Sequence, residues 1–365
     1  MAANAERAGQ RGVVLLVALL AIALLTLLVM EFTFTTQVDY RRAAHWLEAR
    51  QALLIARSGI DLGREILAQA ELVHQLVTGQ AKVADSLSEL WAQPCAPPGP
   101  DSCPSDFGPL CVIDAGPGKV ALRITDESGL YNLNRLARAS HPAAEREREV
   151  FERIAAAAGV APQLLGPLAD WIDRDERPFP FGSGAESAEY ATVPGAVGPR
   201  NGPFRTFAEV ALVSGSSAQT LVRLRRLTTV LEGEDALSIN VNTAPLELLA
   251  ALDPAIAPLL PVLAEERCSA PFESVSDLRE RVPEWPKWLG DRWVRFRSDW
   301  FRIRATGIVG EVRQSAEALV HREAGTIRVV YYRARRGVNI PQVEEAGAID
   351  LEELGARAMG GRERL

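Results

Sequence analysis

The sequence is poor in the side chains that most often carry catalysis. Its 365 residues include only four histidines, which are scattered, and no H-E-x-x-H, G-x-S-x-G or P-loop motif is present. Asp126 and Glu127 are adjacent acids, but neighbouring residues on a turn usually face apart. Asn132 and Asn134 are expected to fix that turn through bonds from side chain to backbone. We therefore expect a protein that is not an enzyme.

An excess of positive charge is also missing. The chain has 40 basic and 47 acidic residues, which gives a formal net charge of −7. Such a protein has no long-range attraction for a polyanion, so nucleic acid is not an expected partner. The 47% hydrophobic content is enough to bury at least one full core.

Cysteine is scarce. Cys95, Cys103 and Cys111 lie in a segment rich in proline and glycine, and Cys268 stands far from them. The spacing lacks the paired C-x2-C of a zinc site. In an oxidising compartment we expect a disulfide within the 95–111 loop and an ordinary buried thiol at Cys268, although the pairing of the four stays open.

Charged residues are absent from Val13 to Met30, and this run is about 27 Å long as a helix, close to the hydrocarbon core of a bilayer. Basic residues precede it and acidic residues follow it, so the N-terminus is expected in the cytoplasm. Glycine is absent from here to Ile55, and proline too, which predicts one helix of roughly 60 residues. Gly59 and Gly63 are its expected weak points.

A short basic leader that ends in Gly12 and precedes an apolar run resembles the class III signal of type IV pilins and pseudopilins. By that resemblance prepilin peptidase cuts after Gly12, so that 1–12 is a leader and Val13 becomes the methylated first residue. Most members carry glutamate at the fifth mature position, where this chain has Val17. A carboxylate in lipid needs a partner, which in the family is the terminal amine of the preceding subunit.

A subunit with Val17 makes no such contact and needs no predecessor. A simple single-pass anchor, in which the Arg-Gly pair before the span is a coincidence, remains open from this segment alone.

Strand patterns flank a helical region. The runs 110–114 and 119–125 surround Gly-Pro-Gly and predict a hairpin, and alternating residues in 300–310, 315–323 and 325–335 predict three more strands. The region between them has helical patterns. Its helix-start signals are a capping box at Thr206 and Glu209, and Asn242 or Thr243 before Pro245.

These patterns predict an α+β fold with a pseudopilin-like long N-terminal helix, an antiparallel sheet and a large inserted α-helical domain. The expected divisions of the chain are a leader (1–12), a transmembrane part (13–30), helix and first strands (31–138), inserted domain (139–298), returning strands (299–335) and a flexible tail (336–365).

A loop at 169–190 is rich in acidic residues and in proline and glycine. Several carboxylates on irregular backbone suit Ca²⁺, which takes about 6 to 8 oxygen ligands. The EF-hand pattern fails because Arg177 follows Asp175 and the required glycine is missing. A solvated acidic loop, partly neutralised by its arginines, is the alternative on composition.

The segment 238–252 resembles the opening of a helix-hairpin-helix DNA-binding module. The following hairpin, Asp-Pro-Ala-Ile-Ala-Pro, contains an acid and two prolines but no glycine, so it offers a phosphate few N–H donors. A small helical fold for protein contact is the favoured interpretation, and a membrane-anchored DNA receptor is the alternative function.

Five motifs follow one another in an order that resembles the K-type minor pseudopilin of the type II secretion system, over about residues 11 to 333. They are Arg-Gly before a span that lacks the glutamate, ITDESGLYNLNRL, LADWIDRDE with GAESAEY, RNGPFRTFAEVALVSG, and INVNTAPLELLAAL.

The resemblance implies a subunit at the tip of a pseudopilus, which starts or caps the filament with I-type and J-type minor pseudopilins on an inner-membrane assembly platform. It implies a single-pass inner-membrane protein with a periplasmic C-terminal domain. The size of the inserted domain also favours a position at the tip, since a large helical domain cannot pack between stacked subunits. A minor pilin of a type IV pilus is a further alternative.

The resemblance also implies structural calcium in the loop of the inserted domain. The matching positions are Asp173, Asp175, Glu186 and Glu189. Ser187 and Thr206 stand where relatives often have aspartate, so one ion site is expected to be weak or absent. The clustered cysteines are not expected from the family.

Overall fold

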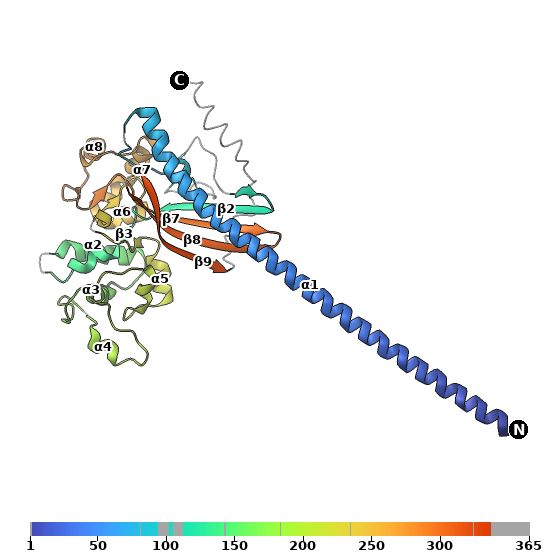
Figure 1. Ribbon diagram of the computed structural model, residues 1–365. Helices are drawn as coiled ribbons and strands as arrows, with labels where there is room; N and C mark the ends of the chain where they lie inside the picture. The colour runs from blue at the N-terminus through green and yellow to red at the C-terminus, as the bar shows by residue number, and fades with distance from the viewer. Residues whose placement is uncertain are drawn as a thin grey trace.

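One continuous helix dominates the molecule (Figure 1). In this computed structural model the described residues are 2–80, 82–93, 102–104, 112–141, 144–182, 184–233, 235–323 and 325–336. Helix α1 spans Ala2–Thr78, 77 residues, which confirms the expected long helix and extends it in both directions. Among the described residues it is the one helix long and apolar enough to cross a membrane. The predicted tail lies outside the described residues, apart from Arg336.

The second half of α1 packs on a five-stranded antiparallel sheet of order β1-β2-β7-β8-β9. The sheet confirms the predicted hairpin and the three later strands. Its strands are β1 (Val112–Ala115), β2 (Gly118–Asp126), β7 (Trp300–Val309), β8 (Val312–Glu323) and β9 (Thr326–Arg336). The strand β9 forms one edge of this sheet.

Small residues allow α1 to approach the sheet closely. A Cβ atom on Gly59 would lie 2.7 Å from the Cβ of Ala305, and one on Gly63 would lie 2.7 Å from Cγ2 of Ile303. The helix is unbroken at both glycines, and their weakening effect stays a prediction. They are contact points, where the absence of a side chain lets helix and sheet share one core.

A second body, the inserted block, lies between β2 and β7, two strands that are neighbours in the sheet. Its α-helices are α2 (Glu145–Ala157), α3 (Leu165–Ile172), α4 (Ser187–Ala191), α5 (Ala218–Leu224), α6 (Leu246–Leu252), α7 (Leu260–Ser269) and α8 (Val275–Arg281). The block has its own core of large buried side chains, among them Phe151, Phe204, Phe272 and Trp285.

Short 3₁₀ turns and paired extended segments lie between the longer elements of the chain. The turns are η1 (Leu90–Ala92), η2 (Leu133–Arg138), η3 (Pro162–Leu164), η4 (Phe207–Leu212), η5 (Asp235–Leu237) and η6 (Pro254–Leu259). Two parallel pairs were not predicted: β3 (Tyr131–Asn132) with β4 (Thr228–Thr229), and β5 (Ile239–Asn240) with β6 (Val294–Arg295). Each strand has only two residues, too few for an alternating pattern.

The two predicted helix starts have different outcomes. The capping box of Thr206 and Glu209 is confirmed, although it opens the 3₁₀ turn η4. Helix α6 begins at Leu246, directly after Pro245, so the predicted helix start is confirmed, although neither Asn242 nor Thr243 caps the helix. Asn242 instead bonds the backbone of Phe272 on both sides, at 2.8 and 2.9 Å, which holds two distant segments together.

A disulfide joins Cys103, before β1, to Cys268 in α7. The expectations of a free thiol at Cys268 and of a disulfide within the loop for Cys103 are therefore wrong, while Cys95 and Cys111 lie outside the described residues. Sequence proximity favoured the loop, but the fold brings together two cysteines 165 residues apart. The bridge fastens the chain between stem and sheet to the inserted block.

Candidate functional site

Three carboxylates converge on one point of the inserted block. Asp170 belongs to the last turn of α3, Asp173 follows that helix, and Glu186 precedes α4. One oxygen from each lies within 4.8 Å of the others. Asp170 is fully buried and Glu186 is 2% exposed, so these charges are removed from bulk water.

Only some of the carboxylate oxygens in this group accept hydrogen bonds from the described residues. Asp170 Oδ2 accepts hydrogen bonds from the N–H groups of Phe179 and Ala185 at 3.2 and 2.6 Å, and Asp173 Oδ2 accepts one from Ser140 Oγ at 3.1 Å. The other oxygen of each aspartate and both carboxylate oxygens of Glu186 are buried, and no described residue donates a hydrogen bond to them. Such oxygens are costly unless a cation compensates them.

The same geometry makes ionisation of the group difficult. Burial, followed by repulsion between the acids, raises the pKa of Glu186 to about 7. Burial raises the pKa of Asp173 to about 6, although its bond from Ser140 opposes the shift. The pKa of Asp170 is raised as well, mainly by burial. A divalent cation would remove this repulsion and leave all three carboxylates charged.

The donor set fits a hard cation. Every unpaired atom is a carboxylate oxygen, the ligand type that Ca²⁺ prefers, and the site contains neither sulfur nor imidazole within the described residues. Gly184 closes the loop around it, because a Cβ at this position would lie 2.5 Å from both Asp170 Oδ2 and Phe179 N.

The structure brings together two of the four predicted ligands. Asp173 and Glu186 are in the group, but Asp175 and Glu189 are not. Asp175 accepts a bond from its neighbour Arg177 N at 2.9 Å, and Glu189 Oε2 accepts one from Glu186 N at 2.8 Å. Asp170 was not chosen from the sequence. A signal was available, because it is an aspartate within the otherwise apolar helix α3, all of which is buried.

Asp126 and Glu127 face apart, as the sequence suggested. Asp126 accepts bonds from Ser298, Thr243 and the N–H of Ser128, whereas Glu127 binds Arg302 and Arg225. Burial raises the pKa of Asp126 to about 6. Burial would also raise the pKa of Glu127, but the two arginines hold it at about 2. The pair therefore anchors β2 to the inserted block.

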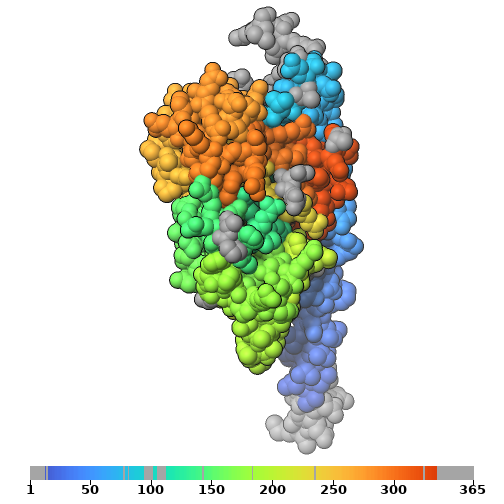
Figure 2. Space-filling view, turned by 90° about the vertical axis from the view of Figure 1, so that its left-hand side faces the viewer, coloured from blue at the N-terminus to red at the C-terminus, as the bar shows by residue number. Residues whose placement is uncertain are grey.

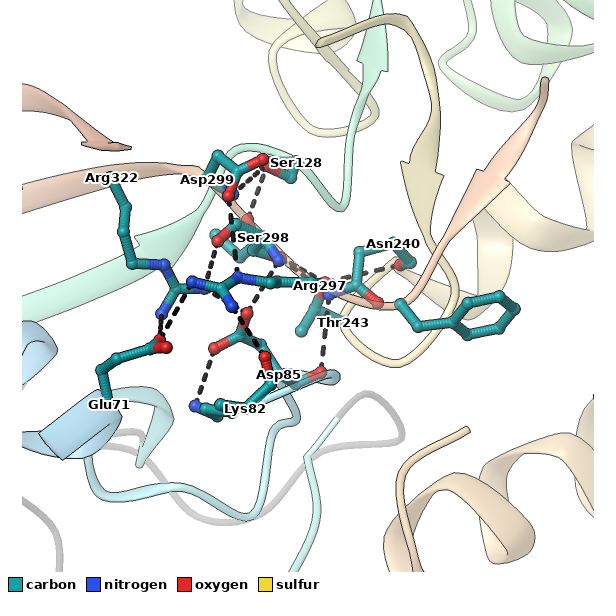
Figure 3. A network of polar contacts seen from close by, with 12 residues as sticks. Glu71, Lys82, Asp85, Ser128, Asn240, Thr243, Arg297, Ser298, Asp299 and Arg322 are labelled. Atoms are coloured by element: carbon teal, nitrogen blue, oxygen red, sulfur yellow. Dashed lines mark hydrogen bonds and ion pairs between the residues drawn. The ribbon is translucent and has the colours of Figure 1, made fainter. Parts of the chain in front are cut away.

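A buried polar junction, centred on Asp85, joins stem, sheet and block (Figure 3). Asp85 is fully buried and accepts bonds from Lys82 Nζ and Ser298 N, both at 2.7 Å, and from Arg322 of β8. Asn240 of the inserted block donates to Ser298 Oγ at 2.7 Å. Burial opposes ionisation of Asp85, yet Lys82 and Arg322 together lower its pKa. The end of the stem is thus fixed to both bodies.

The predicted processing and assembly residues lie on α1. Gly12, Val13 and Val17 are all helical, and the Val13 and Val17 side chains are 64% and 57% exposed. Cleavage after Gly12 and the role of Val17 stay predictions.

The predicted DNA-binding hairpin presents acidic and apolar groups. Between α6 and α7, Asp253 accepts bonds from Ala255 N at 2.8 Å and Trp288 Nε1 at 2.6 Å. The hairpin therefore uses these N–H groups internally, and its one charged side chain is an acid.

An apolar stem that continues as a helix packed on an antiparallel sheet defines the pilin-like class, and here a pseudopilin fold with a large inserted block. Residues 129–233 match the family model for type II secretion system (T2SS), protein K. A relative in Pseudomonas aeruginosa, type II secretion system protein K, is 30% identical over 89% of this chain and 92% of its own length. The chain belongs to the type II secretion system protein K family.

Further relatives agree. The protein of the same name from Klebsiella pneumoniae is 27% identical, over 89% of this chain and 96% of the relative. The crystal structure of the GspK-GspI-GspJ complex from enterotoxigenic Escherichia coli matches with a TM-score of 0.62 and 20% identity, over 81% of this chain and all of that chain. The structural match confirms the fold.

Proposed function

We propose that this minor pseudopilin occupies the tip of a type II secretion pseudopilus, where it starts or caps the filament that supports protein export. The position of the inserted block carries the proposal. Because β2 and β7 are neighbours, the whole block leaves the sheet at one place and forms a broad mass beside the stem (Figure 2). Such a mass has room at the end of a fibre but not between closely stacked stems.

Val17 supports the same position. A subunit inside the filament gains from a carboxylate that meets the terminal amine of its predecessor, whereas the first subunit has no predecessor. An unpaired acid in the bilayer would only destabilise it. The apolar Val17 therefore suits a subunit that begins the filament.

The proposed partners are I-type and J-type minor pseudopilins, with the inner-membrane assembly platform below them. Support comes from the relative of known structure, which is part of a GspK-GspI-GspJ complex. Prepilin peptidase is the proposed processing enzyme, acting after Gly12. The proposed topology has a cytoplasmic N-terminus and a periplasmic head, which agrees with a disulfide between Cys103 and Cys268.

Calcium is the proposed structural ion of the inserted block. Asp170, Asp173 and Glu186 would hold it, and the unpaired oxygens of these three side chains support the assignment. When bound, the ion supplies positive charge that ties the end of α3 to the start of α4. Asp175 and Glu189 are proposed to shape the loop rather than to ligate directly.

The test uses the full chain, co-expressed with its I-type and J-type siblings and purified in detergent. We expect a complex of the three proteins, a mature N-terminus at Val13, and one copy of this chain at the end of each fibre. Val17→Glu should reduce filament initiation, while the matched variant Val17→Leu should not. Copies repeated along the shaft, or an intact leader in the mature protein, would contradict the proposal.

Neither alternative function is favoured. A DNA receptor would need a basic hairpin, and the hairpin contains Asp253 in internal bonds. A minor pilin of a type IV pilus is disfavoured because the chain belongs to a secretion family.

A further inference from the structure

A cleft of about 310 Å³ lies between the inserted block and the face of the sheet that is turned away from α1. The block contributes residues of η4 and α5, and the sheet contributes residues of β7, β8 and β9. Its apolar walls include Phe207, Leu221, Leu319 and Tyr331. The cleft shares no lining residue with the acid group of Asp170, Asp173 and Glu186.

Arginine dominates the polar lining. Five arginines line the cleft, Arg205, Arg225, Arg302, Arg304 and Arg333, against one carboxylate, Glu317. Glu317 binds Arg302 and Arg304 at 2.8 and 2.7 Å, and Glu127 beneath the cleft binds Arg225 and Arg302 at 2.8 and 2.6 Å. Two carboxylates therefore face five guanidinium groups, and the cleft keeps a net positive charge.

Part of that charge has no internal partner. The Nη1 atom of Arg225 is buried and has no hydrogen-bond acceptor among the described residues. Arg205 and Arg333 are exposed and form no ion pair within the described part of the chain. The nearby Glu209 is already bound to Arg200 at 3.0 Å and to the N–H of Thr206.

The register of the sheet extends this basic surface to its open edge. Arg123, Arg304, Glu317 and Arg333 are successive cross-strand partners, so they form one row on one face. The row ends on β9, the edge strand. The described chain ends at Arg336, only three residues after Arg333, so the chain leaves the structure close to the cleft.

A lipid headgroup cannot reach this place while the stem stands upright in a bilayer. Tyr332 of β9 accepts a bond from Arg57 at 3.3 Å, which places β9 beside residue 57 of α1. The apolar run ends at Met30, and the intervening helix is about 40 Å long. A headgroup of that bilayer is therefore not the occupant.

The sequence beyond β9 has the matching chemistry. Between Gly337 and Ala356 it contains five acids and no lysine or arginine: Glu344, Glu345, Asp350, Glu352 and Glu353. Ile349 and Leu351 among them suit the apolar walls. From Arg336 to Glu344 an extended chain spans up to about 26 Å, enough to return to the cleft. A tethered segment also acts at an effective concentration of about millimolar.

We propose that this arginine cleft is the docking site of the chain's own acidic segment, residues 343–354. Docking places carboxylates against Arg205, Arg333 and the unpaired Nη1 of Arg225, and apolar side chains against Phe207 and Tyr331. Because the walls come from block and sheet, the segment fastens one to the other. It also covers the free edge near β9, so a partner that needs this edge must displace it.

Hydrogen exchange of the full chain in detergent tests the proposal. At low salt, amides of residues 343–354 are expected to exchange about tenfold more slowly than in the variant Arg205→Glu/Arg333→Glu, and about 0.5 M salt should remove the difference. The matched control Arg50→Glu/Arg292→Glu makes the same charge change at exposed sites away from the cleft and should leave the protection intact.

A charge swap separates contact from general destabilisation. Lysine at Glu344, Glu345, Glu352 and Glu353 should abolish protection in the wild-type background and restore it when combined with Arg205→Glu/Arg333→Glu. A tail that exchanges freely in the wild type overturns the proposal. So does a cleft that is protected only by added inorganic phosphate, by anionic vesicles or by an I-type or J-type partner, since the occupant is then external.

Discussion

Gly307 of β7 lies directly against the backbone of Ala52 in α1, so closely that a Cβ on this glycine would be 1.9 Å from the Ala52 carbonyl oxygen. Gly59 and Gly63 on the helix likewise leave room for the side chains of Ala305 and Ile303, so helix and sheet approach closely at all three glycines. The attachment of the stem to the sheet therefore depends on the absence of side chains at these three glycines.

Gly307→Ala should weaken this attachment. The added methyl cannot move away from a backbone carbonyl, so we expect a loss of about 1 to 3 kcal/mol in the free energy of unfolding. Denaturant unfolding of the full chain in detergent measures it. Gly198→Ala is the matched control, because a Cβ there meets nothing within 4 Å. Equal midpoints for the two variants would show that α1 sits further from the sheet than described.

Removal of the Cys103–Cys268 bridge should destabilise the head. The bond closes a loop across 165 residues of sequence, so we expect its loss to cost about 2 to 4 kcal/mol in the double variant Cys103→Ala/Cys268→Ala. A reductant should lower the melting temperature of the wild type. The double variant is the control, since reductant should leave its melting temperature unchanged; an equal response in both would place the stabilising bridge elsewhere.

Asp170→Asn should abolish calcium binding, because Asp170 is the most buried member of the acid group. In the wild type, calcium at about a hundred times its dissociation constant should stabilise the head by roughly 2.7 kcal/mol, and chelator should lower the melting temperature. Calorimetry with calcium alone gives the stoichiometry.

Asp175→Asn separates the two possible ligand sets. It should retain calcium binding, since the Asp175 side chain bonds backbone outside the acid group. Loss of binding in Asp175→Asn with retention in Asp170→Asn would favour the choice made from the sequence. No metal by elemental analysis, together with no response to chelator, would remove the calcium proposal.

Glu127→Gln should leave the buried Arg302 and the partly exposed Arg225 without the charge that they share, and removal of one member of a buried ion pair costs about 3 to 5 kcal/mol. The Glu127 pKa is lowered to about 2, so its stabilising effect is complete above the ordinary pKa of 4.5 and is lost as pH falls through about 2. Denaturant unfolding of both proteins at several acid pH values should show that the difference between their free energies of unfolding becomes smaller as the pH falls. A gap independent of pH would mean that packing, not charge, is lost.

The large features of the fold were predictable because they follow from extended patterns. An apolar run followed by uninterrupted helical spacing led to α1, and alternation led to β7, β8 and β9. The function of Gly59 and Gly63 was not predictable, because propensity describes an isolated helix and their value comes from the opposing strands. The disulfide was missed for the same reason, since nothing near Cys268 in sequence points to Cys103.

The acid group was half predicted. The sequence pattern of the 169–190 loop favoured acids on irregular backbone, and two of these, Asp173 and Glu186, belong to the group. It passed over Asp170, whose place in an apolar helix marks it as a buried charge that needs compensation. The sequence does not separate Asp175 and Glu189 from the members of the group, because only the folded loop shows which carboxylates accept bonds from nearby backbone.

The unbroken course of α1 makes the stem stiff along its axis. It contains no proline, and near its end Glu71 forms ion pairs with Arg297 and with Arg322 of β8. An axial displacement at the lower end therefore reaches the head with little loss in bending. Any machine that lifts the base by one subunit step advances the whole bulky cap by the same step.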